Sequence, residues 1–189
     1  MADIVLIQTS MNPESKSAKV VEKMAQYLDQ KGISYEIIDI REYEIEMCDG
    51  RKINQYSQDV QNVYNELENA QAYVIAYPVY NNSYSGATKN LLDIMSKAME
   101  NKICGLVSVS ASPSSTNNGQ GELRESLNGY FSIETPLPYV HYHWGDFNNQ
   151  GEIRRESKMN DKLEDMLDKL IDHIHDNSDK NDSNYAMAA

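Results

Sequence analysis

Apolar residues switch between two spacings along this chain, and this alternation limits the fold more than any other feature of the sequence. Residues 4–7 are an unbroken apolar run, as expected of a parallel strand that is covered on both faces. Residues 15–31 instead carry apolar side chains at helical spacing, and Gly32 follows as a helix terminator. The switch recurs, with strands expected at 35–40, 72–77, 103–109 and 138–142 and helices at 57–69, 86–99 and near 120–129. A last helix is expected from the stripe Leu163, Met166, Leu167, Leu170, Ile171 and Ile174.

Alternating strands and helices predict a parallel sheet with right-handed crossover connections. Five such strands favour a flavodoxin-like α/β fold, which is a doubly wound sheet of order 2-1-3-4-5 with helices on both faces. We expect one domain over residues 1–175, because the sequence contains no repeat and no second core pattern. Residues 176–189 are polar and lack apolar periodicity, which predicts a disordered polar tail.

The charge of the chain argues against a nucleic-acid partner. Its 29 acidic and 17 basic residues give a formal charge of −12, and the basic residues are scattered. The apolar runs are too short to span a membrane, and the first residues lack the pattern of a secretory signal. Two cysteines, Cys48 and Cys104, are too few for a disulfide framework. These features predict a cytoplasmic protein with reduced thiols.

The first strand-to-helix loop, residues 8–17, gathers groups that bind phosphate. It contributes three hydroxyls and an amide just before an expected helix: Ser10, Ser15, Ser17 and Asn12. Helix N-termini bind phosphate through free N–H groups and the helix dipole, and hydroxyls add donors. The alternative is that Ser15 only caps the helix, which needs a single hydroxyl. The spacing matches neither a Walker P-loop nor Gly-x-Gly-x-x-Gly.

The second loop runs from Pro78 to Asp93, between an expected strand and an expected helix. In open α/β sheets ligands bind there, beyond the carboxyl ends of the strands. The segment offers hydroxyls, amides and backbone N–H groups and has no charge before Lys89, which suits a neutral, flat ring with polar edges. The alternative is an ordinary connection, in which Asn and Ser are common.

The third loop, Ser108 to Gly121, is long and rich in hydroxyls. Loops of this length without regular structure tend to be binding loops or lids. A mobile surface loop without a role in binding is the alternative.

Two motifs on these loops resemble the NADPH-dependent FMN reductase family of flavodoxin-like proteins, and the resemblance covers roughly residues 3–145. The motifs are Thr9-Ser10-x-Asn12-x-x-Ser15-x-Ser17 and Pro78-x-Tyr80-Asn81-x-Ser83-x-Ser85-Gly86-x-x-Lys89-Asn90-x-x-Asp93. The resemblance implies an oxidoreductase in which NADPH or NADH passes hydride to FMN. The flavin then reduces a quinone, a flavin, an azo compound or a metal ion. No catalytic side chain is implied, because the cofactor carries the chemistry.

The resemblance also implies which residues hold FMN. The phosphate would be bound by Ser10, Asn12, Ser15 and Ser17. The edge of the ring would be lined by Pro78, Val79, Tyr80 and Asn81, and its other side would be bordered by Ser110 and Ser112. Lys89, Asn90 and Asp93 begin a helix that would pack the subunits of a homodimer or homotetramer, or would serve a structural role.

The chain departs from the family at the start of the first loop. The family usually has Gly-Ser-x-Arg, whereas this chain has Thr9-Ser10-Met11-Asn12, so a charge-assisted phosphate contact is missing. Lys16 is a candidate replacement, and a solvated lysine is the alternative. Two other functions stay open: a flavodoxin-like electron carrier, whose Thr-x-Thr-Gly-Asn-Thr loop is absent, and a flavin-free scaffold or regulatory protein that keeps the fold.

His141 and His143 lie on one face of an expected strand, next to Trp144. This spacing permits metal binding, but no third ligand lies nearby in the sequence, so we expect no metal site. Lining of the flavin or substrate site and simple packing are the other roles open to this segment.

The last residues form a separate motif. Asn181-Asp182-x-Asn184-Tyr185-Ala186-x-Ala188-Ala189 resembles the bacterial tag that marks stalled chains for degradation by Clp-type proteases. The resemblance implies a Clp-type protease as a partner, and either a short-lived protein or an added tag. Recognition needs an exposed, unstructured end.

Overall fold

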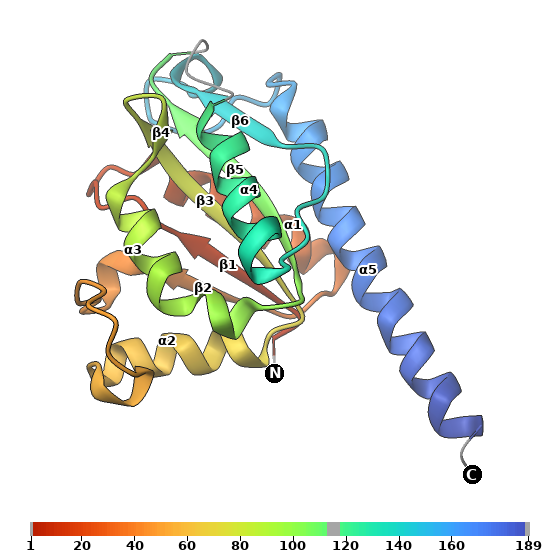
Figure 1. Ribbon diagram of the computed structural model, residues 1–189. Helices are drawn as coiled ribbons and strands as arrows, with labels where there is room; N and C mark the ends of the chain where they lie inside the picture. The colour runs from red at the N-terminus through yellow and green to blue at the C-terminus, as the bar shows by residue number, and fades with distance from the viewer. Residues whose placement is uncertain (1, 113–117, 188–189) are drawn as a thin grey trace.

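Five parallel strands form the centre of the protein (Figure 1). The computed structural model describes residues 2–112 and 118–187. Its parallel strands are β1 (Ile4–Gln8), β2 (Tyr35–Asp39), β3 (Ala72–Tyr80), β5 (Ile103–Ser110) and β6 (Val140–His143). They are ordered β2-β1-β3-β5-β6, which confirms the predicted doubly wound order and the flavodoxin-like fold.

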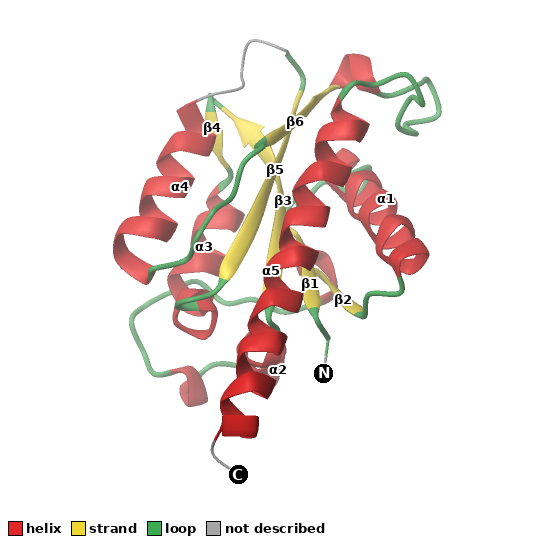
Figure 2. Cartoon of the chain, turned by 90° about the vertical axis from the view of Figure 1, so that its right-hand side faces the viewer, coloured by secondary structure: helices red, strands yellow, loops and turns green. Residues whose placement is uncertain are grey.

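Helices cover both faces of this sheet (Figure 2). One face carries α1 (Lys16–Lys31) and α5 (Met159–Met187), and the other carries α2 (Gln58–Asn69), α3 (Gly86–Met95) and α4 (Asn118–Phe131). Single turns of 3-10 helix occur at Ile40–Glu42, Ile53–Gln55, Ser96–Met99 and Trp144–Asp146.

Side chains that point alternately to the two faces of the sheet contribute to two apolar clusters, one on each face. Ile4 and Leu6 of β1 pack under α1 and α5, whereas Val5 and Ile7 pack under α2 and α3. Successive side chains of a strand point to opposite faces, so an unbroken apolar run feeds both clusters. The predicted helix ends are also present: the Ser15 hydroxyl accepts from the Ala18 N–H, and Gly32 adopts a left-handed φ of 70°.

The segment after β3 differs from the predicted loop. β3 continues to Tyr80 and then pairs antiparallel with the short strand β4 (Ser83–Tyr84). Asn81 and Asn82 join the two strands with φ of 51° and 62°. Positive φ at both central residues is the geometry of a tight two-residue hairpin turn, and Asn tolerates it better than other residues with a Cβ. We call residues 78–84 the β3–β4 hairpin.

Two further segments differ from expectation. β5 continues to Ser110 and α4 begins at Asn118, so the third loop is shorter than the predicted segment from Ser108 to Gly121. Within this loop, residues 113–117 lie outside the described part. α5 continues to Met187, through most of the segment for which the sequence predicts disorder. Among its residues up to 177, the last buried one is Ile174, and beyond it the helix runs away from the body (Figure 1). The division at residue 175 therefore stays a prediction, with residues 188–189 outside the described part.

No helix in the described part combines the length and the apolar content that a membrane span requires.

Candidate functional site

A cavity of about 430 Å³ lies where β1, β3 and β5 end. It is lined by Ser10, Asn12, Glu14, Ser15, Lys16, Ser17, Pro78, Val79, Tyr80, Val109, Ser110, Ala111 and Trp144. This volume is in the range of small-molecule and cofactor sites. The place agrees with the general position of ligands in open α/β sheets, beyond the carboxyl ends of the strands. We call it the β-edge cavity.

Nine of the eleven residues that the sequence singles out lie in the wall of this cavity. They are Ser10, Asn12, Ser15, Lys16, Ser17, Pro78, Val79, Tyr80 and Ser110. The other two, Asn81 and Ser112, are not part of the wall: Asn81 sits in the hairpin turn, and Ser112 follows the wall residues of β5. Glu14, Val109, Ala111 and Trp144 complete the wall.

The loop between β1 and α1 is held in shape by its own side chains. Ser10 Oγ accepts from the Asn12 N–H at 3.3 Å, and Asn12 Oδ1 accepts from the Glu14 N–H at 2.9 Å. Ser15 Oγ accepts from the Ala18 N–H at 3.1 Å, so Ser15 both caps α1 and lines the cavity. The first N–H groups of a helix have no partner within the helix, and Lys16 and Ser17, the first two residues of α1, line this cavity.

Arg41 reaches this loop from the end of β2. Its Nη1 donates to the carbonyl oxygens of Asn12 at 3.0 Å and Pro13 at 3.1 Å. Its guanidinium also pairs with Asp39, and Gln8 Nε2 donates to Asp39 Oδ1 at 3.0 Å. Burial raises the pKa of Asp39, but the hydrogen bonds from Arg41 and Gln8 outweigh burial and the pKa lies below its usual value. No motif in the sequence links residue 41 to this loop.

Lys16 stands in the first turn of α1, beside two aromatic rings. Its Nζ lies 5.5 Å from the centre of the Trp144 ring and 5.4 Å from that of Phe147. Cations over aromatic faces are held by the ring quadrupole. A positive charge therefore lies at the cavity wall, although the loop lacks the arginine that the family usually has. Trp144 is 60% exposed, so one edge of the cavity is an accessible indole.

The β3–β4 hairpin forms the opposite wall, and buried contacts fix the start of α3, which follows the hairpin directly. Thr9 Oγ1 and Thr88 Oγ1 are 2.8 Å apart, and Ser85 Oγ lies 2.9 Å from the same Thr88 oxygen. These bonds tie the first loop to the start of α3. On the other side, α4 approaches so closely that a Cβ on Gly119 would meet the Ser83 Cα at 2.9 Å.

The start of α3 serves the fold. Asn90 is 9% exposed; its Oδ1 accepts from the Cys48 N–H at 2.8 Å and its Nδ2 donates to the Glu46 carbonyl at 2.9 Å. Asn90 therefore holds the segment between β2 and α2 against the helix. Lys89 and Asp93 pair with each other on the exposed surface.

His141 and His143 contact serine and aspartate side chains. His141 lies between Ser108 and Ser110, and the N–H of His143 donates to Asp146 Oδ2 at 2.9 Å. Within residues 2–112 and 118–187, no group of three or more His, Cys, Asp or Glu side chains is arranged to hold a metal ion.

Comparison with known proteins finds relatives of this chain by sequence. A sequence model of the family described as NADPH-dependent FMN reductase matches residues 2–144. An NAD(P)H-dependent FAD/FMN reductase of Geobacillus thermodenitrificans is 29% identical over 122 residues, which are 64% of this chain and 65% of the relative. An NADPH FMN reductase of Pseudomonas putida is 29% identical over 101 residues, which are 53% of this chain and 50% of that relative. The matched regions thus span less than two thirds of either relative.

Among solved structures, a flavoenzyme NAD(P)H:acceptor oxidoreductase of Paracoccus denitrificans is similar, with a TM-score of 0.73. The two share 16% of their residues, and the superposition covers 93% of this chain and 98% of that one. At this identity the likeness shows a common fold.

Proposed function

The chain belongs to the NADPH-dependent FMN reductase family, and we propose that it binds FMN and passes reducing equivalents from NADPH or NADH to a small-molecule acceptor. The acceptor would be a quinone, a flavin, an azo compound or a metal ion. The observation that carries this proposal is the β-edge cavity. It joins the hydroxyl-rich N-terminus of α1 to a wall formed by the β3–β4 hairpin and Trp144.

The donor set of the cavity fits both ends of FMN. Ser10, Ser15 and Ser17 are buried, and they surround the N-terminus of α1, where a phosphate is stabilised by N–H groups and the helix dipole. Lys16 adds a positive charge there. At the other end, Val79 and Tyr80 offer apolar surface and backbone groups to a flat ring, and Tyr80 is 52% exposed in this structure.

Bound FMN would supply the hydride chemistry, accepting hydride from the nicotinamide and passing electrons to the acceptor. The work of this chain is to orient the partners. The α1 N-terminus would anchor the phosphate, and the hairpin would fix the plane of the ring. Trp144 would limit the access of water and of large acceptors to the open side.

The first test is a spectrum of the purified protein after reconstitution with FMN. We expect a yellow protein that bleaches when NADPH is added without oxygen. A reconstituted sample without flavin absorbance would overturn the proposal and favour a flavin-free scaffold. Bleaching without turnover of any two-electron acceptor would favour an electron carrier.

The Asn12→Asp variant tests the phosphate end. An aspartate keeps the acceptor that holds the Glu14 N–H but places a negative charge beside the phosphate. We expect FMN to bind roughly tenfold more weakly, a loss of about 1.4 kcal/mol, while riboflavin, which lacks the phosphate, binds as in the wild type. Fluorescence titration measures both constants. Equal weakening for the two flavins would show that the phosphate does not lie at this loop.

Two partners follow from the same reading. We propose a homodimer or homotetramer that packs through α3, because Asn90 holds the neighbouring segment so that Met47 is 74% exposed beside that helix. Sedimentation velocity measures this, and a monomer would contradict it. We also propose that a Clp-type protease recognises the last residues of the chain, of which 181–187 belong to the end of α5 and 188–189 lie outside the described part, so recognition requires this end of the helix to open. An unchanged cellular half-life of the Ala188→Asp, Ala189→Asp variant would contradict that.

A further inference from the structure

A row of polar side chains crosses three strands next to the β-edge cavity. Tyr77 of β3, Ser108 of β5 and His141 of β6 lie opposite one another in the sheet register. His141 Nδ1 is 2.7 Å from Ser108 Oγ, and its Nε2 is 3.1 Å from Ser110 Oγ. Both ring nitrogens of one half-buried imidazole are thus held by hydroxyls, and Ser110 also lines the cavity.

The neighbouring bonds fix the direction of each hydrogen bond in this row. Gln120 Nε2 donates to Ser108 Oγ at 2.7 Å, so the hydrogen of Ser108 is free to point at His141 Nδ1. Ser110 Oγ donates to the Ser112 carbonyl at 2.5 Å, so it accepts from His141 Nε2. The neutral imidazole therefore carries its hydrogen on Nε2, on the side of the β-edge cavity.

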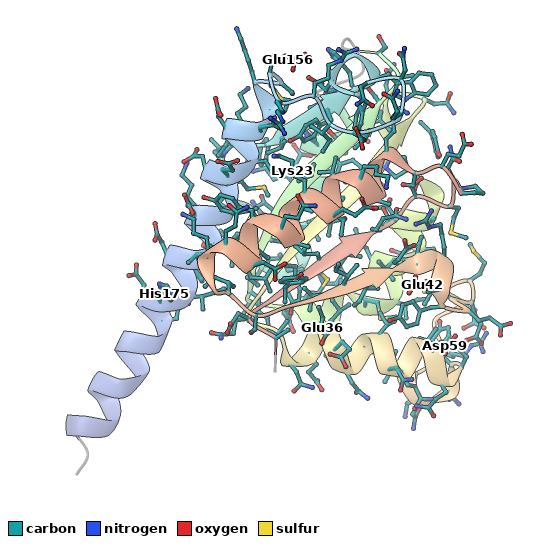
Figure 3. The ribbon with its side chains drawn as sticks, turned by 180° about the vertical axis from the view of Figure 1, so that it is seen from behind. Lys23, Glu36, Glu42, Asp59, Glu156 and His175 are labelled. Atoms are coloured by element: carbon teal, nitrogen blue, oxygen red, sulfur yellow. The ribbon has the colours of Figure 1, made fainter. Side chains whose placement is uncertain are left out.

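His141 also lines a second cavity, of about 530 Å³, together with His143 and Gly145. The charged and titratable groups around that cavity are His143, Asp146, Arg154, Glu156 and Lys158. Figure 3 shows Glu156 at the end of the molecule where the loops gather. The His141–Ser110 contact thus joins a residue of one cavity to a residue of the other.

We propose that His141 is a positioning residue that delivers a proton to the β-edge cavity through the Ser110 hydroxyl. This inference rests on the proposed function. Reduction of a quinone-type acceptor A follows NAD(P)H + A + H⁺ → NAD(P)⁺ + AH₂. The hydride carries two electrons and one proton, so a second proton must reach the acceptor within the site.

The row of side chains accounts for each hydrogen in this transfer. The imidazole takes a proton from solvent on Nδ1 while the Ser108 hydroxyl turns away from that nitrogen, and it becomes a cation with hydrogens on both nitrogens. Its Nε2–H bond breaks as the proton moves to Ser110, whose hydroxyl turns from the Ser112 carbonyl and gives its own hydrogen to the acceptor anion. Neutral His141 remains, with its hydrogen on Nδ1. Ser108 then accepts that hydrogen bond, and its hydroxyl turns toward the buried Tyr77 hydroxyl, which has no well-formed hydrogen bond within the described residues. Proton exchange with solvent restores the Nε2–H form of His141.

The surroundings make the imidazolium a ready donor. Burial and the neighbouring His143 lower the pKa of His141 below its usual 6.5, against the opposing effects of a backbone hydrogen bond at Ser112 and the charge of Asp146. We therefore expect the rate of quinone reduction to fall as the pH rises through this pKa.

The His141→Gln variant tests the inference, with His175→Gln as the control. His175 lies part-way along α5, well away from Glu156 (Figure 3). We expect flavin content and the rate of flavin reduction by NADPH to be unchanged in both variants. Quinone reduction by the reduced protein should slow on the order of tenfold to a hundredfold in His141→Gln alone and lose its pH dependence. Ferricyanide takes electrons without protons, and its rate should stay constant.

A readout without cofactor comes from nitrogen NMR of the imidazoles in the flavin-free protein. We expect His141 to be neutral at pH 7 with its hydrogen on Nε2, because its pKa lies below the usual 6.5. A charged ring or the Nδ1–H form at pH 7 would overturn the relay, as would equal quinone rates in His141→Gln and wild type. A wild-type protein that binds no flavin would instead overturn the proposed function.

Discussion

Contacts from the end of β2 shape the loop between β1 and α1, which forms part of the wall of the β-edge cavity. The carbonyl oxygens of Asn12 and Pro13 are held by Arg41, and Arg41 is held by Asp39. Gln8 Nε2 binds the same carboxylate, and the Ser10 N–H donates to the Gln8 side chain. The ionised form of Asp39 therefore supports the loop from beneath, and the cavity depends on a charge that does not line it.

We expect Asp39→Asn to show this through the pH dependence of stability. The pKa of Asp39 is lower in the folded protein than its usual 3.8, so its contribution is complete above about pH 4 and is lost as the pH falls further. At pH 7 the variant should lose about 1.5–3 kcal/mol, the usual value for a hydrogen bond to a charged group. Urea unfolding between pH 3 and pH 7 measures the difference from the wild type.

This difference should shrink as the pH drops below about 4, because the wild type then loses the same contribution. Asp172→Asn, at an exposed carboxylate on α5, is the control. A difference that stays constant over the whole range would show that Asp39 is not the titrating group.

At this scale the sequence predicted the hydroxyls of the site and missed the residues that orient them. Ser10, Ser15 and Ser17 stand in a local motif, so their shared position follows from chain order alone. Arg41 meets Asn12 only because β1 and β2 are paired with Gln8 opposite Asp39. Such a register depends on the packing of both faces and cannot be read from one loop.

Among the elements, the β3–β4 hairpin carries the site and rests against α4. Gly119 allows this contact, because a Cβ there would meet the backbone of Ser83 and Tyr84 at 2.9–3.1 Å. Gly121 stands two residues further along the same helix with nothing within 4 Å of the corresponding Cβ position. Substitutions at the two glycines therefore distinguish the effect of close packing from the effect of helix propensity.

We expect opposite effects of alanine at these two positions. Gly121→Ala should raise the free energy of unfolding by up to about 1 kcal/mol, because alanine favours the helix. Gly119→Ala should lower it and weaken FMN binding, since the backbone of the hairpin must move. Thermal unfolding and flavin titration measure the pair. If both substitutions stabilise the protein, the backbone of the hairpin can move away from α4 without a loss of stability.

Periodicity predicted every long element and missed the shortest. The strands and helices of the parallel sheet each present several turns or alternations of apolar side chains, which is a signal that a single sequence contains. β4 has two residues, and its existence depends on two positive φ angles at Asn81 and Asn82. Asn is equally common in irregular loops, so the sequence favoured a loop there.

At the scale of the whole molecule, α5 continues beyond the point where it leaves the body of the protein. The helix continues to Met187, but Ile174 is the last of its residues up to 177 that is buried in the core. The strand order was predictable because right-handed crossovers leave few arrangements of five parallel strands. The extent of α5 was not, because residues 176–189 lack the apolar periodicity by which a helix is recognised in a sequence.

We expect a chain that ends at residue 177 to unfold at the same temperature as the full chain. Figure 1 shows this end of the helix running away from the body, so we expect its removal to take no apolar surface from the core. Leu170→Ala, at a fully buried position of the same helix, should cost about 2–5 kcal/mol. Calorimetry compares the three proteins, and a lower unfolding temperature for the shortened chain would contradict the expectation.

The apolar cluster beneath α1 and α5 is also the last part of the molecule that synthesis can complete. Its sheet side is made from residues up to Tyr142, whereas its cover on α5 lies between Leu163 and Ile174. The N-terminus of a chain leaves the ribosome first, so part of this face stays exposed to chaperones and to other nascent chains until residues 163–174 have emerged. A message that ends before codon 163 would thus give a chain in which α1 alone covers this face, and cellular quality control can recognise the apolar surface that α5 leaves exposed.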